Sequence, residues 1–242
     1  MLSETLAQYS ALMVMKKLYG EDKIRRFLKF ELDRYLRDRG GEVVEELPLA
    51  RVEDQPYIHY RKGSLAMYLL QHRLGEDAVN RALRKLIGQY KFKSAPYPRS
   101  IDLIQAFRAE AKSPEDQALI TDLFERITLY DLKVQEPKAI RRPDGKWNVT
   151  VPVEARKYYA NGKGEQKEAP LSDFIEIGLF TAEPAGGAFN KNEMIRMERQ
   201  RVRSGKQVFR FVTDTKPAHA GIDPYIFYID RNSADNVAPV TS

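Results

Sequence analysis

The 242-residue chain contains no cysteine. A protein without cysteine has neither disulfide bonds nor thiolate metal ligands, so the redox compartment stays open. The chain also lacks a run of roughly eighteen apolar residues, which a membrane-spanning helix needs. Its first apolar stretch is shorter and has no basic segment before it, unlike a signal peptide. We therefore expect neither a spanning helix nor a signal peptide.

Histidine is scarce as well, since His59, His72 and His219 are the three that the sequence contains. Zinc peptidases need two histidines four positions apart on one helix, in the pattern H-E-x-x-H, and no such pattern occurs here. A solvated or core role is the simpler interpretation of His59. The sequence therefore predicts that these residues alone do not assemble a primary zinc site.

The chain has a formal charge of +6, from 40 basic and 34 acidic residues. This excess permits a nucleic acid or an anionic membrane surface as a partner. The basic residues are, however, interleaved with acids, and no nucleic-acid motif accompanies them, so we expect no nucleic-acid partner. With 43% hydrophobic and 31% charged residues, the composition is that of a folded, soluble globular protein.

Apolar residues recur at helical spacing through the first 128 residues. The predicted helices cover residues 2–19, 21–39, 60–74 and 76–90, with two shorter ones that begin near Ser100 and Ser113. Because the first helix is apolar on nearly all sides, we expect it to be covered on most of them. The second helix should expose a solvated basic face, made of Lys23, Arg25, Arg26, Lys29 and Arg37.

Near Thr128 the pattern changes to alternation with period two and to turns. The predicted strands cover residues 130–134, 147–153, 174–180, 194–202, 207–213 and 225–230. Short strands at regular spacing are typical of a β-sandwich, and the pattern here predicts an immunoglobulin-like one. The predicted fold is therefore α+β and multidomain, with an all-helical part over residues 1–128 and an antiparallel β-sandwich over residues 129–242.

The first predicted helix carries an acid, Glu4, at its start, within the segment SETLAQYSALM that begins at Ser3. For an arbitrary helix, the simple interpretation is a first-turn acid that the helix dipole favours. A second segment, YRKG, begins at Tyr60 and continues as an apolar helix to Leu74 and Gly75. Tyr60 on its own would be an aromatic residue packed on the core.

Together, and in this order, the two segments resemble the M1 zinc aminopeptidases, which belong to the gluzincins. The resemblance implies that Glu4 is the third zinc ligand and that Tyr60 stabilises the oxyanion of the tetrahedral intermediate. It also implies that Gly63 lets its helix approach a neighbour closely. Two departures are visible: Ser-Glu-Thr replaces the commoner Asn-Glu-Gly around Glu4, and His59 and Arg61 flank Tyr60.

The resemblance implies that the chain is the C-terminal portion of a zinc-dependent M1-type peptidase that hydrolyses N-terminal peptide bonds. The H-E-x-x-H helix and the zinc would then belong to the longer parent, and this chain alone would be inactive. Its segment around Glu4 is similar to bacterial M1-like domains joined to membrane permease segments. That similarity would place the parent at the membrane of a bacterial cell envelope.

Two other hypotheses stay open. The chain could be a non-catalytic protein-interaction module of a transporter-associated protein, in which Glu4 and Tyr60 are replaceable. It could also be a helical nucleic-acid binder, whose binding would weaken steeply with salt.

Overall fold

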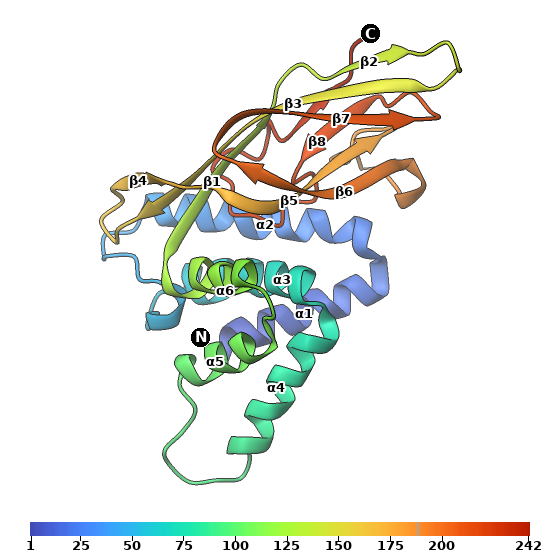
Figure 1. The fold of residues 1–242 in the computed structure, drawn as a ribbon. Helices are drawn as coiled ribbons and strands as arrows, with labels where there is room; N and C mark the ends of the chain where they lie inside the picture. Colours follow the sequence, from blue (N-terminus) through green and yellow to red (C-terminus); the bar gives the residue numbers. More distant parts are fainter. Residues whose placement is uncertain (188) are drawn as a thin grey trace. The chain divides into compact units, whose positions relative to one another are not determined.

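The computed structural model describes residues 1–187 and 189–242, and it has an α+β fold in which helices precede antiparallel sheets (Figure 1). The α-helices of the described residues are α1 (Glu4–Tyr19), α2 (Glu21–Gly40), α3 (Gly63–Leu74), α4 (Glu76–Tyr90), α5 (Ser100–Glu110) and α6 (Pro114–Ile120). Shorter turns, of which η2 and η3 are π-helical, are η1 (Leu49–Arg51), η2 (Tyr57–Lys62), η3 (Thr121–Glu125) and η4 (Lys191–Glu193). No described helix combines the length and apolar character needed to cross a bilayer.

The strands begin where the helical pattern ends, and they form two sheets. The first contains β1 (Ile127–Val134), β2 (Lys138–Arg141), β3 (Trp147–Ala160), β4 (Gln166–Ala169) and β7 (Gly205–Thr213). The second has the order β6-β5-β8-β9, with β5 (Ser172–Phe180), β6 (Met194–Arg203), β8 (His219–Ile222) and β9 (Val237–Pro239).

The chain divides into two compact units. The helical unit contains residues 1–18, 30–128 and 159–166. The β unit contains residues 19–29, 129–158 and 167–242. Each unit is described separately below.

The core of the helical unit is built around α3, in which every residue from Gly63 to Gln71 is buried. A helix that is covered on all sides is expected to be apolar all round, as this segment largely is. Helix α4 instead buries a single stripe, made of Ala78, Val79, Ala82 and Leu86, which its periodicity predicted. The same periodicity placed Ile87 in the stripe, and that part of the prediction is wrong, because Ile87 is 59% exposed at the end of the helix. The turn η2 leads directly into α3. Because α3 is buried, the end of η2 that joins it is held in place.

Strand β3 shows the alternation that the sequence predicted, since Val149, Val151, Val153 and Ala155 are buried and face one side. Its antiparallel partner β7 pairs in register from Trp147 opposite Thr213 to Ala155 opposite Gly205. Every second residue of β3 thus contributes to a core.

The prediction that α1 is covered on most sides is wrong. Helix α1 buries one narrow face, which consists of Thr5, Tyr9 and Leu12. Val14 is 57% exposed and Leu18 is 67% exposed, so most of its second apolar face remains open to solvent in the described part of the chain. Nearly continuous apolar sequence predicted burial on all sides, but only the face that packs within the helical unit is buried.

The prediction that Arg25 belongs to a solvated basic face is also wrong. Arg25 is 8% exposed, and its Nε donates to the carbonyl oxygen of Pro224 at 2.7 Å within the β unit. Burial lowers the pKa of Arg25, and the carboxylate of Asp223 opposes this effect. A long side chain can bury its stem and still satisfy its charged head, which helical periodicity does not show.

The strand predicted over residues 225–230 is absent, and this segment is irregular. The Asp223 carboxylate accepts hydrogen bonds from the backbone N–H groups of Phe227 at 2.9 Å and Tyr228 at 3.0 Å. Because a side chain takes these donors, they are not available to a strand partner. Asp223 and Ile226 also have positive φ angles, of 44° and 60°, which a regular strand does not contain.

Candidate functional site

The two residues that the sequence singled out, Glu4 and Tyr60, lie together in the helical unit. The Tyr60 hydroxyl donates a hydrogen bond to the Glu4 carboxylate, although the two residues are far apart in the sequence. Glu4 is the first residue of α1, and Tyr60 lies in the π-helical turn η2. The Ser3 hydroxyl donates to the same carboxylate, at 3.0 Å from Oε1. The carboxylate therefore has two hydroxyl donors and remains partly exposed.

The neighbouring residues fix this pair. The hydroxyl of Thr5, which is fully buried, donates to the carbonyl oxygen of His59 at 2.6 Å. Two successive residues of α1 thus bond two successive residues of η2. A Cβ atom added to Gly63 would lie 2.4 Å from Thr5 Oγ1, closer than real Cβ contacts allow. The expectation that Gly63 permits a close approach is therefore confirmed, and the partner is α1.

The turn η2 has π-helical geometry, in which the N–H of Gly63 reaches back to the carbonyl oxygen of Ile58, five residues earlier. Such turns are rare and occur frequently at functional sites. The sequence predicted a helix beginning at Tyr60, whereas the helical backbone begins at Tyr57 and becomes α-helical at Gly63. Tyr60 therefore lies inside a wide turn rather than at a helix start.

Arg61 and Glu31 form an ion pair beside Glu4 and Tyr60. Arg61 Nη1 lies 2.9 Å from Oε2 of Glu31, and Gln8 Nε2 donates to Oε1 of the same carboxylate at 2.9 Å. Glu31 is 4% exposed, so its charge is buried and compensated by a cation and an amide. The three residues link α1, α2 and η2 within the helical unit.

Lys62 is the most deeply buried member of η2, with its side chain 1% exposed. Its ammonium group lies 3.5 Å from Oε1 of Glu46, which also accepts from the Tyr35 hydroxyl at 2.5 Å. Arg39 Nε lies 2.5 Å from the other oxygen of Glu46. Burial lowers the pKa of Lys62 to about 8, and the Glu46 carboxylate opposes this effect. Four successive residues of η2 are thus each held by a different residue.

The electrostatics of the pair follow from its hydrogen bonds. The donors Tyr60 and Ser3 hold the pKa of Glu4 below its ordinary value, and a positive charge on His59 or the amino terminus acts in the same direction. The bond to Glu4 in turn raises the pKa of Tyr60. Burial lowers the pKa of His59, whose ring lies edge-on to that of Tyr60 with centroids 4.9 Å apart. Near neutral pH the arrangement therefore combines an ionised carboxylate with a protonated phenol.

The described residues do not bring three or more histidine, aspartate or glutamate side chains together in a group that could hold a metal ion. A carboxylate such as Glu4 is chemically suited to act as one zinc ligand, but tetrahedral zinc needs further nitrogen or oxygen ligands. The described chain thus fits a single ligand position and not a whole zinc site.

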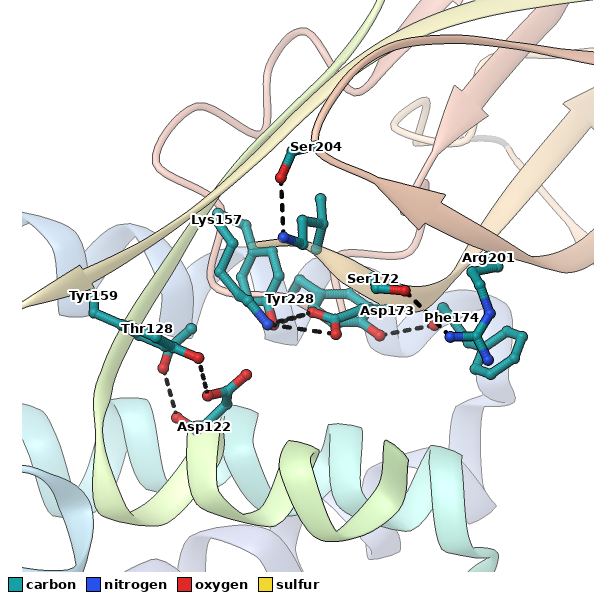
Figure 2. Close-up of polar contacts among 12 residues, drawn as sticks. Asp122, Thr128, Lys157, Tyr159, Ser172, Asp173, Phe174, Arg201, Ser204 and Tyr228 are labelled. Atoms are coloured by element: carbon teal, nitrogen blue, oxygen red, sulfur yellow. Dashed lines mark hydrogen bonds and ion pairs between the residues drawn. The ribbon is translucent and has the colours of Figure 1, made fainter. Parts of the chain in front are cut away.

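Another group of polar contacts surrounds β3 (Figure 2). In the helical unit, the Tyr159 hydroxyl donates to Asp122 Oδ1 at 2.8 Å, and the Thr128 hydroxyl donates to the Asp122 carbonyl oxygen at 2.9 Å. In the β unit, Lys157 Nζ lies 3.2 Å from Asp173 Oδ2, with the lysine side chain 6% exposed. These groups are paired with one another, so we assign them to stability.

Sequence reasoning missed the residues that hold η2, namely Thr5, Glu31 and Glu46. Glu31 carried a usable signal, because an acid directly before Leu32 on the apolar side of a helix needs a buried partner. Glu46 carried none, since it follows the predicted end of the second helix in an apparently extended connector. Thr5 resembles an ordinary first-turn residue, and its bond to His59 depends on tertiary structure.

Comparison with known proteins does not assign the chain to a family: no protein-family model matches it, and no curated protein matches it.

Proposed function

We propose that this chain is the C-terminal portion of a zinc-dependent M1-type aminopeptidase, which hydrolyses N-terminal peptide bonds. The observation that carries the proposal is the hydrogen bond between Glu4 and Tyr60. The resemblance assigns a metal-ligand role to one residue and an oxyanion-binding role to the other. Such roles require the two side chains to be neighbours, and a hydroxyl that reaches the ligand carboxylate also lies beside any metal that the carboxylate holds.

In this proposal each residue has one task. The lowered pKa of Glu4 keeps its carboxylate ionised, as a metal ligand must be. The raised pKa of Tyr60 keeps its hydroxyl protonated, as a donor to a developing oxyanion must be. Zinc, when bound, would polarise the scissile carbonyl and activate water. The remaining ligands and the general base would come from an H-E-x-x-H helix of the longer parent chain, and this chain alone would be inactive.

The surface of α1 supports the need for a further partner segment. Over most of its length the exposed side of this helix carries small and apolar residues at helical spacing, with Lys17 as the charged exception, and these residues are Ala7, Ser10, Ala11, Val14 and Leu18. Small residues at this spacing allow another helix to approach closely, and exposed apolar side chains favour such packing. An additional helix on this side would lie along the helix that carries Glu4.

At the level of domains, we propose that residues 1–128 are the helical C-terminal half of a peptidase catalytic domain and that residues 129–242 are an immunoglobulin-like β-sandwich. Two antiparallel sheets of five and four strands support a sandwich. The start of β1 at Ile127 supports a change of architecture near residue 128.

The proposal is tested in the full-length protein encoded by the gene that contains this sequence, with an aminoacyl-anilide as substrate. Tyr60→Phe should lower kcat about 10²–10³-fold with little change in KM, because it removes an oxyanion donor. Tyr19→Phe, which alters an exposed phenol, is the matched control and should be neutral. Unchanged activity of Tyr60→Phe and Glu4→Gln would contradict the enzyme proposal. It would favour the alternative of a non-catalytic interaction module of a transporter-associated protein.

A further inference from the structure

The connection between α4 and α5 exposes an aromatic tip. This tip, residues 91–98, lies in the helical unit and extends beyond the ends of both helices (Figure 1). Phe92 is 101% exposed and Tyr97 is 72% exposed, although large apolar side chains on a folded surface normally have some cover. Ile87, at the end of α4, is 59% exposed and extends the apolar surface beside the tip.

The tip is held in place at its base. Asp102 Oδ2 accepts from the backbone N–H of Arg99 at 2.8 Å, and the backbone N–H of Lys93 donates to the carbonyl oxygen of Tyr90 at 3.3 Å. A hydrogen bond therefore holds each end of the connection to the helix beside it. Phe92 has a φ of 59°, a conformation that costs about 1–3 kcal/mol for a residue other than glycine. Phe92 is thus strained and fully exposed on a loop whose ends are held. Its side chain buries no surface that would stabilise the fold and offset this strain.

The sequence segment around the tip is basic, although Glu110 pairs with Arg81 and Asp102 pairs with Arg99. From Ala78 to Ile101 the sequence contains no aspartate or glutamate. The same stretch contains six basic residues, which are Arg81, Arg84, Lys85, Lys91, Lys93 and Arg99. A second basic stretch without acidic residues runs from Arg199 to Thr213, but it belongs to β6 and β7, whereas the stretch from Ala78 to Ile101 places positive charge around the exposed apolar groups of the tip.

We propose that this tip docks onto the surface of an anionic lipid bilayer. Phe92 and Tyr97 would enter the interfacial region, while Lys91 and Lys93, one on each side of Phe92, would meet acidic headgroups. A protruding tip suits a planar surface, whereas single-stranded nucleic acid is typically bound in a basic groove that follows its backbone. The inference is independent of the proposed peptidase function, since the tip connects α4 and α5 whereas Glu4 lies in α1 and Tyr60 in η2.

The test is sedimentation of the purified chain with vesicles of phosphatidylcholine alone or with about 30% phosphatidylserine. Binding should require phosphatidylserine and should weaken with salt. Phe92→Ser with Tyr97→Ser should weaken it about tenfold or more, as should Lys91→Glu with Lys93→Glu. Val43→Ser, at a position 96% exposed in the same unit, is the apolar control and should be neutral. Lys206→Glu, on an exposed part of β7, is the charge control.

A second measurement reports insertion without removing the apolar groups. Tryptophan fluorescence of Phe92→Trp should shift to the blue with anionic vesicles, and that of Val43→Trp should not, with Trp147 as a constant background. Absence of vesicle binding would overturn the proposal. It would also be overturned if the tip variants bound vesicles as well as the native protein did while Lys206→Glu abolished binding. Retention of a single-stranded oligonucleotide that depends on Phe92, without vesicle binding, would overturn it in favour of nucleic acid.

Discussion

The Tyr60 hydroxyl donates a hydrogen bond to the Glu4 carboxylate, and Thr5, the next residue of α1, bonds the carbonyl oxygen of His59. Two adjacent contacts between the same two segments define both their distance and their register. The position of Tyr60 relative to Glu4 is therefore set by the packing of α1 on η2. The first two predictions below follow from this relationship, and the next two from buried charged groups elsewhere.

The first prediction concerns the coupling of the pair. Glu4→Gln removes the carboxylate that raises the pKa of Tyr60, so the pKa of Tyr60 should fall towards its ordinary value of 10.0. Titration of the labelled tyrosine ring carbons by NMR measures this change. Glu110→Gln, which removes a carboxylate paired with Arg81 on another helix, is the control and should leave the titration of Tyr60 unchanged. An unaltered Tyr60 titration in Glu4→Gln would show that the two side chains are not bonded.

The second prediction concerns the close approach at Gly63. Gly63→Ala should destabilise the protein by about 1–3 kcal/mol, because the new methyl group overlaps Thr5. Gly88→Ala, in an open part of α4, should instead stabilise it by about 0.5–1 kcal/mol. Denaturant unfolding measures both changes. Equal effects of the two substitutions would contradict the packing described for α1.

The third prediction uses the buried Lys62. Its pKa is about 8 in the folded state against an ordinary 10.5, so the folded protein binds fewer protons than the unfolded chain between these values. The unfolding free energy should therefore rise from pH 8 to 10, by at most about 1.4 kcal/mol per pH unit. Lys62→Met lacks this titration, so the stability of the native protein relative to this variant should increase with pH. Lys163→Met, at an exposed site, should give a curve parallel to that of the native protein.

The fourth prediction concerns Asp230 in the β unit. Burial raises its pKa from 3.8 to about 7, although the backbone N–H groups of Leu132 and Asn232 donate to its carboxylate. Between pH 4 and 7 the folded protein therefore binds more protons than the unfolded chain. The protonated Asp230 stabilises the fold at low pH, and this contribution to the unfolding free energy is lost as the pH rises through 7. The stability advantage of the native protein over Asp230→Asn should shrink across this window. Asp144→Asn, which changes a turn aspartate with a lowered pKa, is the control. The difference in unfolding free energy between the native protein and this variant should not shrink from pH 4 to 7.

The sequence predicted those parts of the structure that depend on local pattern. The buried stripe of α4, apart from Ile87, and the alternation of β3 were found because a single period governs each of them. The Glu4 and Tyr60 positions came from motif resemblance, and their proximity was not visible from spacing. Three features depend instead on partners that are distant in sequence. They are the extent to which α1 is buried, the burial of Arg25 and the irregular segment after Asp223. Local periodicity carries no information about such partners.

The most direct test of the central claim is the zinc content of the full-length protein and its variants, measured after dialysis against zinc-free buffer. If Glu4 is a zinc ligand, the native protein and Tyr60→Phe should each retain about one zinc ion per chain, whereas Glu4→Gln should lose most of it. Zinc retention by Glu4→Gln equal to that of the native protein would contradict the assignment of Glu4. The absence of zinc from the native protein would contradict the peptidase proposal as a whole.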